Sequence, residues 1–168
     1  GRNGLAQVDF AKFSEITGKL PVAYDYGNST VAAFEMNLNG QPLRFLLNTT
    51  LRSSYLSVEA AAKTGLNTEE TPDRMMIGDQ VVPVGLVREV TLGSGGEKLA
   101  PFDFRVIELA PGGKLAAPVR SCMIFRFPEL AARFQPFDVD GILGLDWVMK
   151  HGAVVDYLSQ AMFVDSAD

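Results

Sequence analysis

The side chains that most often carry out chemistry are scarce in this sequence. It has one cysteine, Cys122, and one histidine, His151. These counts exclude an internal disulfide framework, a multi-cysteine metal site and a histidine-rich metal site. The two residues could form a nucleophile and its base, but Cys122 lies in the apolar run Cys122-Met123-Ile124-Phe125, where a thiol is usually buried and unreactive. The sequence therefore predicts neither a metal ion nor a cofactor.

Two further groups of residues invite a chemical interpretation. Asp138, Asp140 and Asp146 form an acidic cluster, but a calcium loop would need further oxygen ligands at fixed spacing and a closing glutamate, which are missing. We interpret these aspartates as carboxylates that stabilise turns and cap a helix. The segment Gly93-Ser94-Gly95-Gly96 lacks the lysine and the following serine or threonine of a phosphate-binding loop, and it predicts a turn.

The composition is that of a globular domain. Of 168 residues, 47% are hydrophobic and 21% are charged, and the length is typical of one domain of about 100 to 200 residues. The net charge of −5 makes a nucleic-acid partner unfavourable, because such a partner requires a basic surface. No apolar run approaches the ~20 residues of a membrane helix, so we expect no transmembrane segment and a soluble chain. The chain begins at Gly1 rather than Met, which is consistent with a processed mature form, and its compartment is left open.

The first half of the chain predicts short strands and two helices. An apolar face predicts a helix from Asp9 to Ile16, and period-two alternation predicts a strand from Thr30 to Leu38. Asn39-Gly40 is typical of a two-residue hairpin turn, and Pro42–Leu47 is the returning strand. A further strand over Ser53–Leu56 leads to Ser57 as the N-cap of a helix over Val58–Thr64, which Gly65 follows.

The second half predicts a β-meander followed by a compact ending. The strands of the meander are predicted over Met75–Ile77, Val81–Val84, Leu86–Leu92 and Leu99–Leu109, with a turn at Gly78-Asp79. A loop over Ala110–Pro118 follows, and short helices are predicted over Pro128–Phe134 and Leu145–Lys150. The chain ends in paired strands over Ala153–Tyr157 and Ala161–Val164. The fold class is therefore all-β with a few short helices. We expect an N-terminal helix and edge segment over 1–29 and a single domain over 30–168.

Two segments of the chain resemble the retropepsin-like aspartic proteases in their single-lobe, bacterial-type form. In that family a strand ends in two hydrophobic residues and Asp-Thr-Gly-Ala-Ser, and here Phe45-Leu46-Leu47 is followed by Asn48-Thr49-Thr50. About 90 residues later the family has a turn of the type Asp-Gly-Ile-Leu-Gly-Leu-Asp before a helix, and this chain has the same sequence from Asp140 to Asp146. The resemblance extends over roughly Thr30 to Val164. It implies the acid-protease fold, a retropepsin-like closed β-barrel.

The resemblance places Asn48 where the family has its catalytic aspartate. Aspartic proteolysis needs two carboxylates that share one proton, one acting as general base for water and the other as general acid. In a single-lobe member each of two chains supplies one aspartate, so an amide at Asn48 removes both acids at once. Thr50 also replaces a glycine that allows close approach of backbone and substrate. These two departures predict a pseudoenzyme.

The resemblance implies roles for the neighbouring residues as well. Thr49 matches a threonine whose hydroxyl braces the two active loops, and its alternative is an ordinary turn threonine. Gly141, Ile142, Leu143 and Gly144 match a structural turn that packs beside the active loop. The hairpin with Gly78 and Asp79 at its tip matches the flap that covers the cleft, and its alternative is a plain meander turn.

Taken together, the sequence predicts a catalytically inactive aspartic-protease-like domain that acts as a binding or assembly module. Its partner would be a protein or an extended peptide, because pairing with a peptide backbone needs no catalytic acid. A homodimer is implied by the family, but Thr50 at the two-fold axis disfavours close pairing. The alternative is an active aspartic endopeptidase whose catalytic aspartate has been replaced by Asn48.

Overall fold

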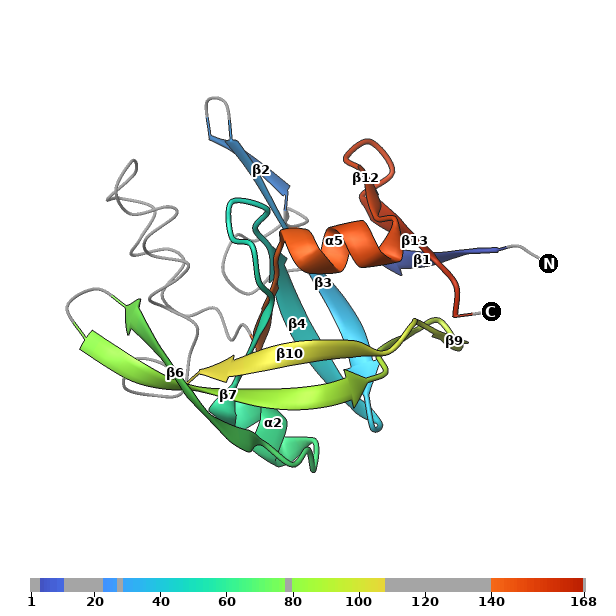
Figure 1. The fold of residues 1–168 in the computed structure, drawn as a ribbon. Coiled ribbons are helices and arrows are strands. Elements are labelled where there is room, and N and C mark those ends of the chain that lie inside the picture. The colour runs from blue at the N-terminus through green and yellow to red at the C-terminus, as the bar shows by residue number, and fades with distance from the viewer. Residues whose placement is uncertain (1–3, 11–22, 27–28, 78–79, 108–139, 168) are drawn as a thin grey trace.

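The computed structural model describes residues 4–10, 23–26, 29–77, 80–107 and 140–167 (Figure 1). Most of them lie in strands. The elements, in chain order, are β1 (Leu5–Asp9), β2 (Ala23–Tyr26), β3 (Ser29–Leu38), β4 (Gln41–Leu47), β5 (Tyr55–Ser57), α2 (Val58–Lys63), β6 (Glu69–Ile77), β7 (Gln80–Val90), β8 (Gly93–Ser94), β9 (Glu97–Lys98), β10 (Phe102–Ile107), β11 (Gly141–Leu143), α5 (Leu145–His151), β12 (Val154–Asp156) and β13 (Ala161–Asp165). The predicted all-β class with short helices is confirmed. The predicted loop over Ala110–Pro118 and the helix over Pro128–Phe134 lie outside the described residues.

The hairpin of β3 and β4 forms as the sequence predicts. Asn39 and Gly40 have φ values of 50° and 80°, which are the positive values that a two-residue type I′ turn requires. Leu38 and Gln41 close the ladder on either side of the turn. The alternation along β3 buries Phe34 and Met36 in the core, so one face of the hairpin supports the rest of the domain.

The largest sheet has the order β6-β7-β10-β5-β11-β4-β3-β8-β9, with β2 added to β3. Among the described strands this order is an open path rather than a closed ring. Strand β11 lies between β4 and β5, parallel to β4 and antiparallel to β5. Two strands that are close in sequence are therefore separated by a strand from near the end of the chain. This arrangement brings the two chemically interesting segments together.

The hairpin of β6 and β7 differs from the prediction. The sequence indicates separate strands over Val81–Val84 and Leu86–Leu92, whereas β7 is continuous from Gln80 to Val90. Gly85 lies inside this strand because its neighbour β6 passes so close that a Cβ there would collide with the side chain of Thr68. The glycine therefore marks a close approach of two strands and not a turn.

A second, three-stranded sheet has the order β1-β13-β12 and joins the two ends of the chain. The predicted helix from Asp9 is wrong at its start, because Asp9 is the last residue of β1 and pairs with Ala161. Phe10 forms a bridge with Phe34 of the large sheet, and the rest of the predicted helix lies outside the described residues. The predicted pairing of β12 with β13 is confirmed.

Both described helices pack against the sheets where the sequence predicts them. Ser57 caps α2, with its hydroxyl accepting the N–H of Ala60 at 2.9 Å. Helix α5 ends at Gly152, whose φ of 56° gives the left-handed cap. Trp147 of α5 is fully buried in the core. Within the described residues no helix has the length and apolarity needed to cross a membrane.

Candidate active site

Asn48 lies at the C-terminal end of β4, where the loop from 48 to 54 begins. The register of β4 against β11 pairs Leu47 with Leu143, so Asn48, the residue after β4, meets the end of β11. The N–H of Asn48 donates to the carbonyl of Leu143 at 2.9 Å. The carbonyl of Asn48 accepts the N–H of Leu51 at 3.2 Å, which closes a tight turn over Asn48-Thr49-Thr50. The two segments quoted from the sequence therefore touch at this point.

The side chain of Asn48 is held by Thr50. Its Oδ1 accepts the hydroxyl of Thr50 at 2.6 Å and the backbone N–H of Thr50 at 3.1 Å. Thr50 is exposed, and so is Thr49, whose hydroxyl makes no hydrogen bond within the described residues. The position that would hold a catalytic carboxylate thus presents an amide with its oxygen fixed by two donors.

A hydrogen-bond network connects the end of this loop to the start of α5. The hydroxyl of Ser54 donates to Oδ1 of Asp146 at 2.6 Å and accepts the N–H of Gly144 at 2.7 Å. The same carboxylate oxygen accepts the N–H of Trp147 at 2.7 Å. Ser54 is 1% exposed and its bond with Gly144 is buried, whereas Asp146 is exposed and its bond with Ser54 is only partly buried. The network ties the end of the loop to the beginning of α5.

The loop also completes the N-terminus of α5. The first N–H groups of a helix have no partner inside the helix. Here the N–H of Leu145 donates to the carbonyl of Leu51 at 2.8 Å, and that of Asp146 donates to the carbonyl of Arg52 at 3.0 Å. This approach needs Gly144, because a Cβ at that position would lie 2.7 Å from the carbonyl carbon of Ser53. The segment Gly141–Gly144, which we call the glycine turn, is therefore a packing requirement of the site.

Asp140, at the other end of the glycine turn, is also a structural residue. Its Oδ2 accepts the N–H of Arg44 at 2.9 Å, and its Oδ1 pairs with Nζ of Lys63 at 3.1 Å. Together with Asp146, it behaves as a turn and capping carboxylate, while Asp138 lies outside the described residues. Among the residues that the structure describes, no group of three histidine, cysteine or acidic side chains could hold a metal ion.

The β6–β7 hairpin extends from the edge of the large sheet (Figure 1). Gly78 and Asp79 lie outside the described residues, and the paired residues nearest to them are Ile77 and Gln80. Nearer to the sheet the pair Met75 and Val82 is half-buried. The structure thus has a long hairpin over β6 and β7, and its role as a flap stays a prediction.

The proposed pairing of Cys122 with His151 finds no support in the surroundings of the histidine. Cys122 lies outside the described residues. His151 is 1% exposed, and its Nδ1 and Nε2 lie 3.0 Å from the carbonyl oxygens of Trp147 and Ala100. Its ring stacks on Trp147 at 4.2 Å between centroids. With both nitrogens occupied by backbone carbonyls, the imidazole is a core residue.

Sequence reasoning missed two features of the site. It treated Thr50 only as a steric obstacle, whereas its hydroxyl binds Asn48. It also gave no role to Ser54, because the partner Asp146 is 92 residues away in the sequence. The contact of Asn48 with Thr50 spans two residues and has a local signal, because an Asn side chain commonly accepts the N–H two residues further on. The contact of Ser54 with Asp146 has no local signal beyond the two residue types.

Comparisons with known proteins agree with this geometry. Residues 34–147, more than half of the chain, match the family model described as aspartyl protease. Comparison with curated protein sequences finds no match. The retroviral protease-like domain of Ddi1 from Leishmania major is similar in structure, with 15% identity, a TM-score of 0.51 and coverage of 80% of this chain and 91% of that one.

A second solved structure covers nearly the whole chain. The retropepsin-like aspartic protease from Rickettsia conorii has 10% identity and a TM-score of 0.51, and the match covers 98% of this chain and 95% of that one. At these identities the structural likeness establishes the fold, and the family model establishes the family. The chain belongs to the aspartyl protease family and has its retropepsin-like fold.

Proposed function

We propose that this chain is an aspartyl-protease domain that has lost catalysis and binds extended peptide segments without cutting them. The observation that carries the proposal is the amide of Asn48 at the end of β4, beside the glycine turn of β11. An amide neither accepts a proton near neutral pH nor carries the negative charge that activates water. The general base of the family's reaction is therefore missing.

The nearby aspartates do not supply a substitute base. Asp146 accepts hydrogen bonds from Ser54 and Trp147, and Asp140 accepts the N–H of Arg44 and pairs with Lys63. These contacts fix the orientation of both carboxylates. Both groups thus serve the packing of the glycine turn. Recruiting either one as a base would break the contacts that hold Asn48 in place.

The loss of the catalytic acid is compatible with peptide binding. An extended peptide is recognised through its backbone and through pockets for alternate side chains, and neither requires a catalytic acid. The loop carrying Asn48 is fixed by the hydrogen bonds to Leu143 and Thr50, so this part of the surface is preorganised. Preorganisation lowers the entropy lost on binding.

The test is retention of intact peptides. The chain is incubated with a peptide library, separated from free peptides by size exclusion, and the retained peptides are weighed by mass spectrometry. We expect retained peptides of uncut mass, among them a set that Thr49→Trp retains at least about tenfold less, because an indole on this exposed turn would obstruct the loop surface. Thr91→Trp places the same side chain at an exposed position outside the loop and should retain peptides normally.

Two kinds of result would contradict the proposal, one for peptide binding and one for the loss of catalysis. Retention that is absent from the unmodified chain, or that is unchanged in Thr49→Trp, would show that the loop of Asn48 is not a peptide-binding surface. Cut peptides would contradict the loss of catalysis.

A further inference from the structure

We infer that a pocket at the base of the β6–β7 hairpin is a second peptide-recognition site, which takes an extended segment of the pattern basic-x-apolar-x-apolar in either chain direction. This inference is independent of the proposed function. The pocket is formed by β6, β7, α2 and β10, with a volume of about 290 Å³. None of its described lining residues belongs to the loop of Asn48 or to the glycine turn.

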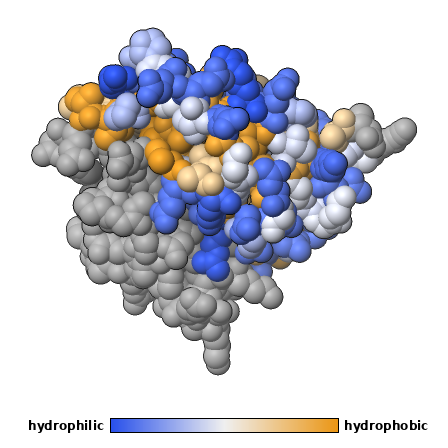
Figure 2. Space-filling model, turned by 90° about the horizontal axis from the view of Figure 1, so that it is seen from below, coloured by the Kyte–Doolittle hydropathy of each residue, from blue (hydrophilic) through white to orange (hydrophobic). Residues whose placement is uncertain are grey.

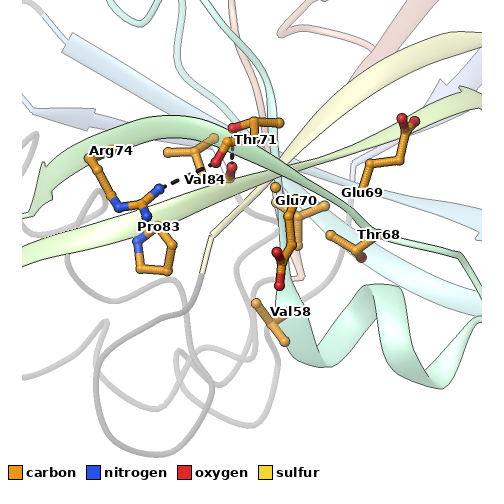
Figure 3. Close-up of a pocket in the computed structure, with 10 residues that line it drawn as sticks. Val58, Thr68, Glu69, Glu70, Thr71, Arg74, Pro83 and Val84 are labelled. Carbon is orange, nitrogen blue, oxygen red and sulfur yellow. Dashed lines mark hydrogen bonds between the residues drawn. The ribbon is translucent and has the colours of Figure 1, made fainter.

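The pocket has an apolar interior with one carboxylate inside it. Val58, Pro83, Val84 and Val106 provide the apolar surface. Figure 3 shows the carboxylate of Glu70 directed toward Val58, whereas Arg74 and Pro83 lie on the other side of the pocket. A volume near 300 Å³ is at the lower limit for ligand pockets, which suits a single large apolar side chain.

The apolar surface continues along the hairpin beyond the pocket. Arg74 pairs with Pro83, and two residues further on Met76 pairs with Val81. Because side chains alternate along a strand, both pairs lie on the same face of the hairpin. Met76 is 68% exposed and Val81 is 63% exposed. In Figure 2, hydrophobic residues form a band that runs inward from one edge of the molecule, with hydrophilic residues along its described border.

The spacing of these two apolar features fits an extended peptide. Successive pairs on one face of a strand are about 6.6 Å apart, at about 3.3 Å for each residue. An extended peptide has the same repeat between its side chains i and i+2. One apolar side chain can therefore enter the pocket while the next but one rests on Met76 and Val81.

Charge complementarity selects the basic end of the segment. Glu70 forms no hydrogen bond or ion pair with any described residue, whereas Glu69 is paired with Arg88 at 2.7 Å. Arg74 is turned back onto its own strand, where Nη1 donates to the carbonyl of Asp73 at 2.8 Å. Of the two glutamates that line the pocket, Glu70 is thus the one without a described partner, and the whole chain is acidic with a net charge of −5. A lysine or arginine two positions from the buried apolar residue would pair with it.

Strand addition is a less suitable mode at this place. β6 is an edge strand, but its pairing with β7 is interrupted between Glu70 and Arg74, and Pro72 has no N–H to donate. An irregular edge with a proline resists pairing with another strand. Recognition by side chains on the face of the hairpin therefore fits these residues better than backbone pairing at its edge.

The experiment is selection from a random nine-residue peptide library displayed on phage, performed in parallel on the unmodified chain and on Glu70→Arg. We expect the unmodified chain to enrich the pattern basic-x-apolar-x-apolar. Glu70→Arg should replace the basic preference by an acidic one while the two apolar positions remain. Glu97→Arg makes the same charge change at an exposed site outside the pocket and should leave the selected pattern unchanged.

A second variant tests the apolar strip. The double substitution Met76→Ser and Val81→Ser changes exposed side chains, so the fold should be retained. It should abolish the preference at the outer apolar position and weaken a selected peptide at least about tenfold in fluorescence polarisation. Selection without this pattern, or a pattern unaffected by Glu70→Arg, would overturn the inference. Loss of binding in Thr49→Trp instead would assign the selected peptides to the loop of Asn48.

Discussion

At the scale of single residues, the site is a loop whose hydrogen bonds hold the amide of Asn48 beside the end of β11. Asn48 keeps the backbone contact with Leu143 that joins β4 to β11, and Thr50 holds its side chain through two hydrogen bonds. The supporting contacts of Ser54 with Gly144 and Asp146 are short, and the one with Gly144 is buried. Under the proposed function, catalysis is lost at one atom, where an amide nitrogen of Asn48 stands in place of a carboxylate oxygen.

Ser54 provides a residue-scale prediction. Ser54→Ala removes one hydrogen bond to a carboxylate and leaves the buried N–H of Gly144 without its acceptor. We expect the free energy of unfolding to fall by about 1 to 3 kcal/mol, the usual cost of leaving a buried donor without its acceptor. Urea denaturation measures the change. The control is Ser53→Ala, whose side chain makes no hydrogen bond within the described residues; equal losses in both variants would contradict the role of the network.

At the scale of elements, the local signals of the sequence were sufficient for some predictions. The Asn39-Gly40 hairpin, the Ser57 cap and the α5 helix were all predicted, because each depends on residues within one or two turns of chain. The strand β1 was not predicted, because its partner β13 lies at the other end of the sequence. The continuity of β7 was not predicted for the same reason. Gly85 is typical of a break in a strand, and its true cause is the close approach of a distant segment at the start of β6.

The candidate site was predictable to a similar extent. The composition around Asn48 and the run from Asp140 to Asp146 identified the two segments that meet. Their contact through Leu143 and the contact of Ser54 with Asp146 depend on the order of strands β4, β11 and β5. Strand order is a property of the whole sheet, so no short window of sequence contains it.

The turn between β12 and β13 provides an element-scale prediction of pH dependence. Hydrogen bonds from Ser159, first from its side chain and then from its backbone, and one from the N–H of Leu158 lower the pKa of Asp156 below its ordinary value. A lowered pKa in the folded state gives stability that is present above the unfolded-state pKa of about 3.9 and is lost as the pH falls through the folded value.

Asp156→Asn should therefore show a smaller decrease of Tm than the unmodified chain when the pH is lowered from 6 to 2. Scanning calorimetry across this range gives the comparison. Glu97→Gln, which also removes an exposed carboxylate, serves as the control. A decrease of Tm with falling pH that is as steep in Asp156→Asn as in the unmodified chain would show that the turn makes no pH-dependent contribution to stability.

At the scale of the whole molecule, the side chain of Thr50 affects whether two copies of the chain can associate. In a single-lobe member of the family the cleft is built from two chains, and Thr50 would lie near the axis between them. In this chain Thr50 is exposed and retains its Cβ where the family motif has glycine. We therefore expect the unmodified chain to sediment as a monomer at micromolar concentration, and Thr50→Gly to shift the distribution toward a dimer. A stable dimer of the unmodified chain in sedimentation velocity would contradict the steric role of Thr50.

The central claim is that this aspartyl-protease domain does not cleave peptides because Asn48 replaces the catalytic acid. The most direct measurement is a peptide-library cleavage assay between pH 3 and 8, read by mass spectrometry, on the unmodified chain, on Asn48→Asp and on Asn48→Asp combined with Thr50→Gly. We predict no cleavage by the unmodified chain and none by Asn48→Asp alone, because Thr50 still crowds the site; activity is expected first in the double variant. Cleavage by the unmodified chain would contradict the claim.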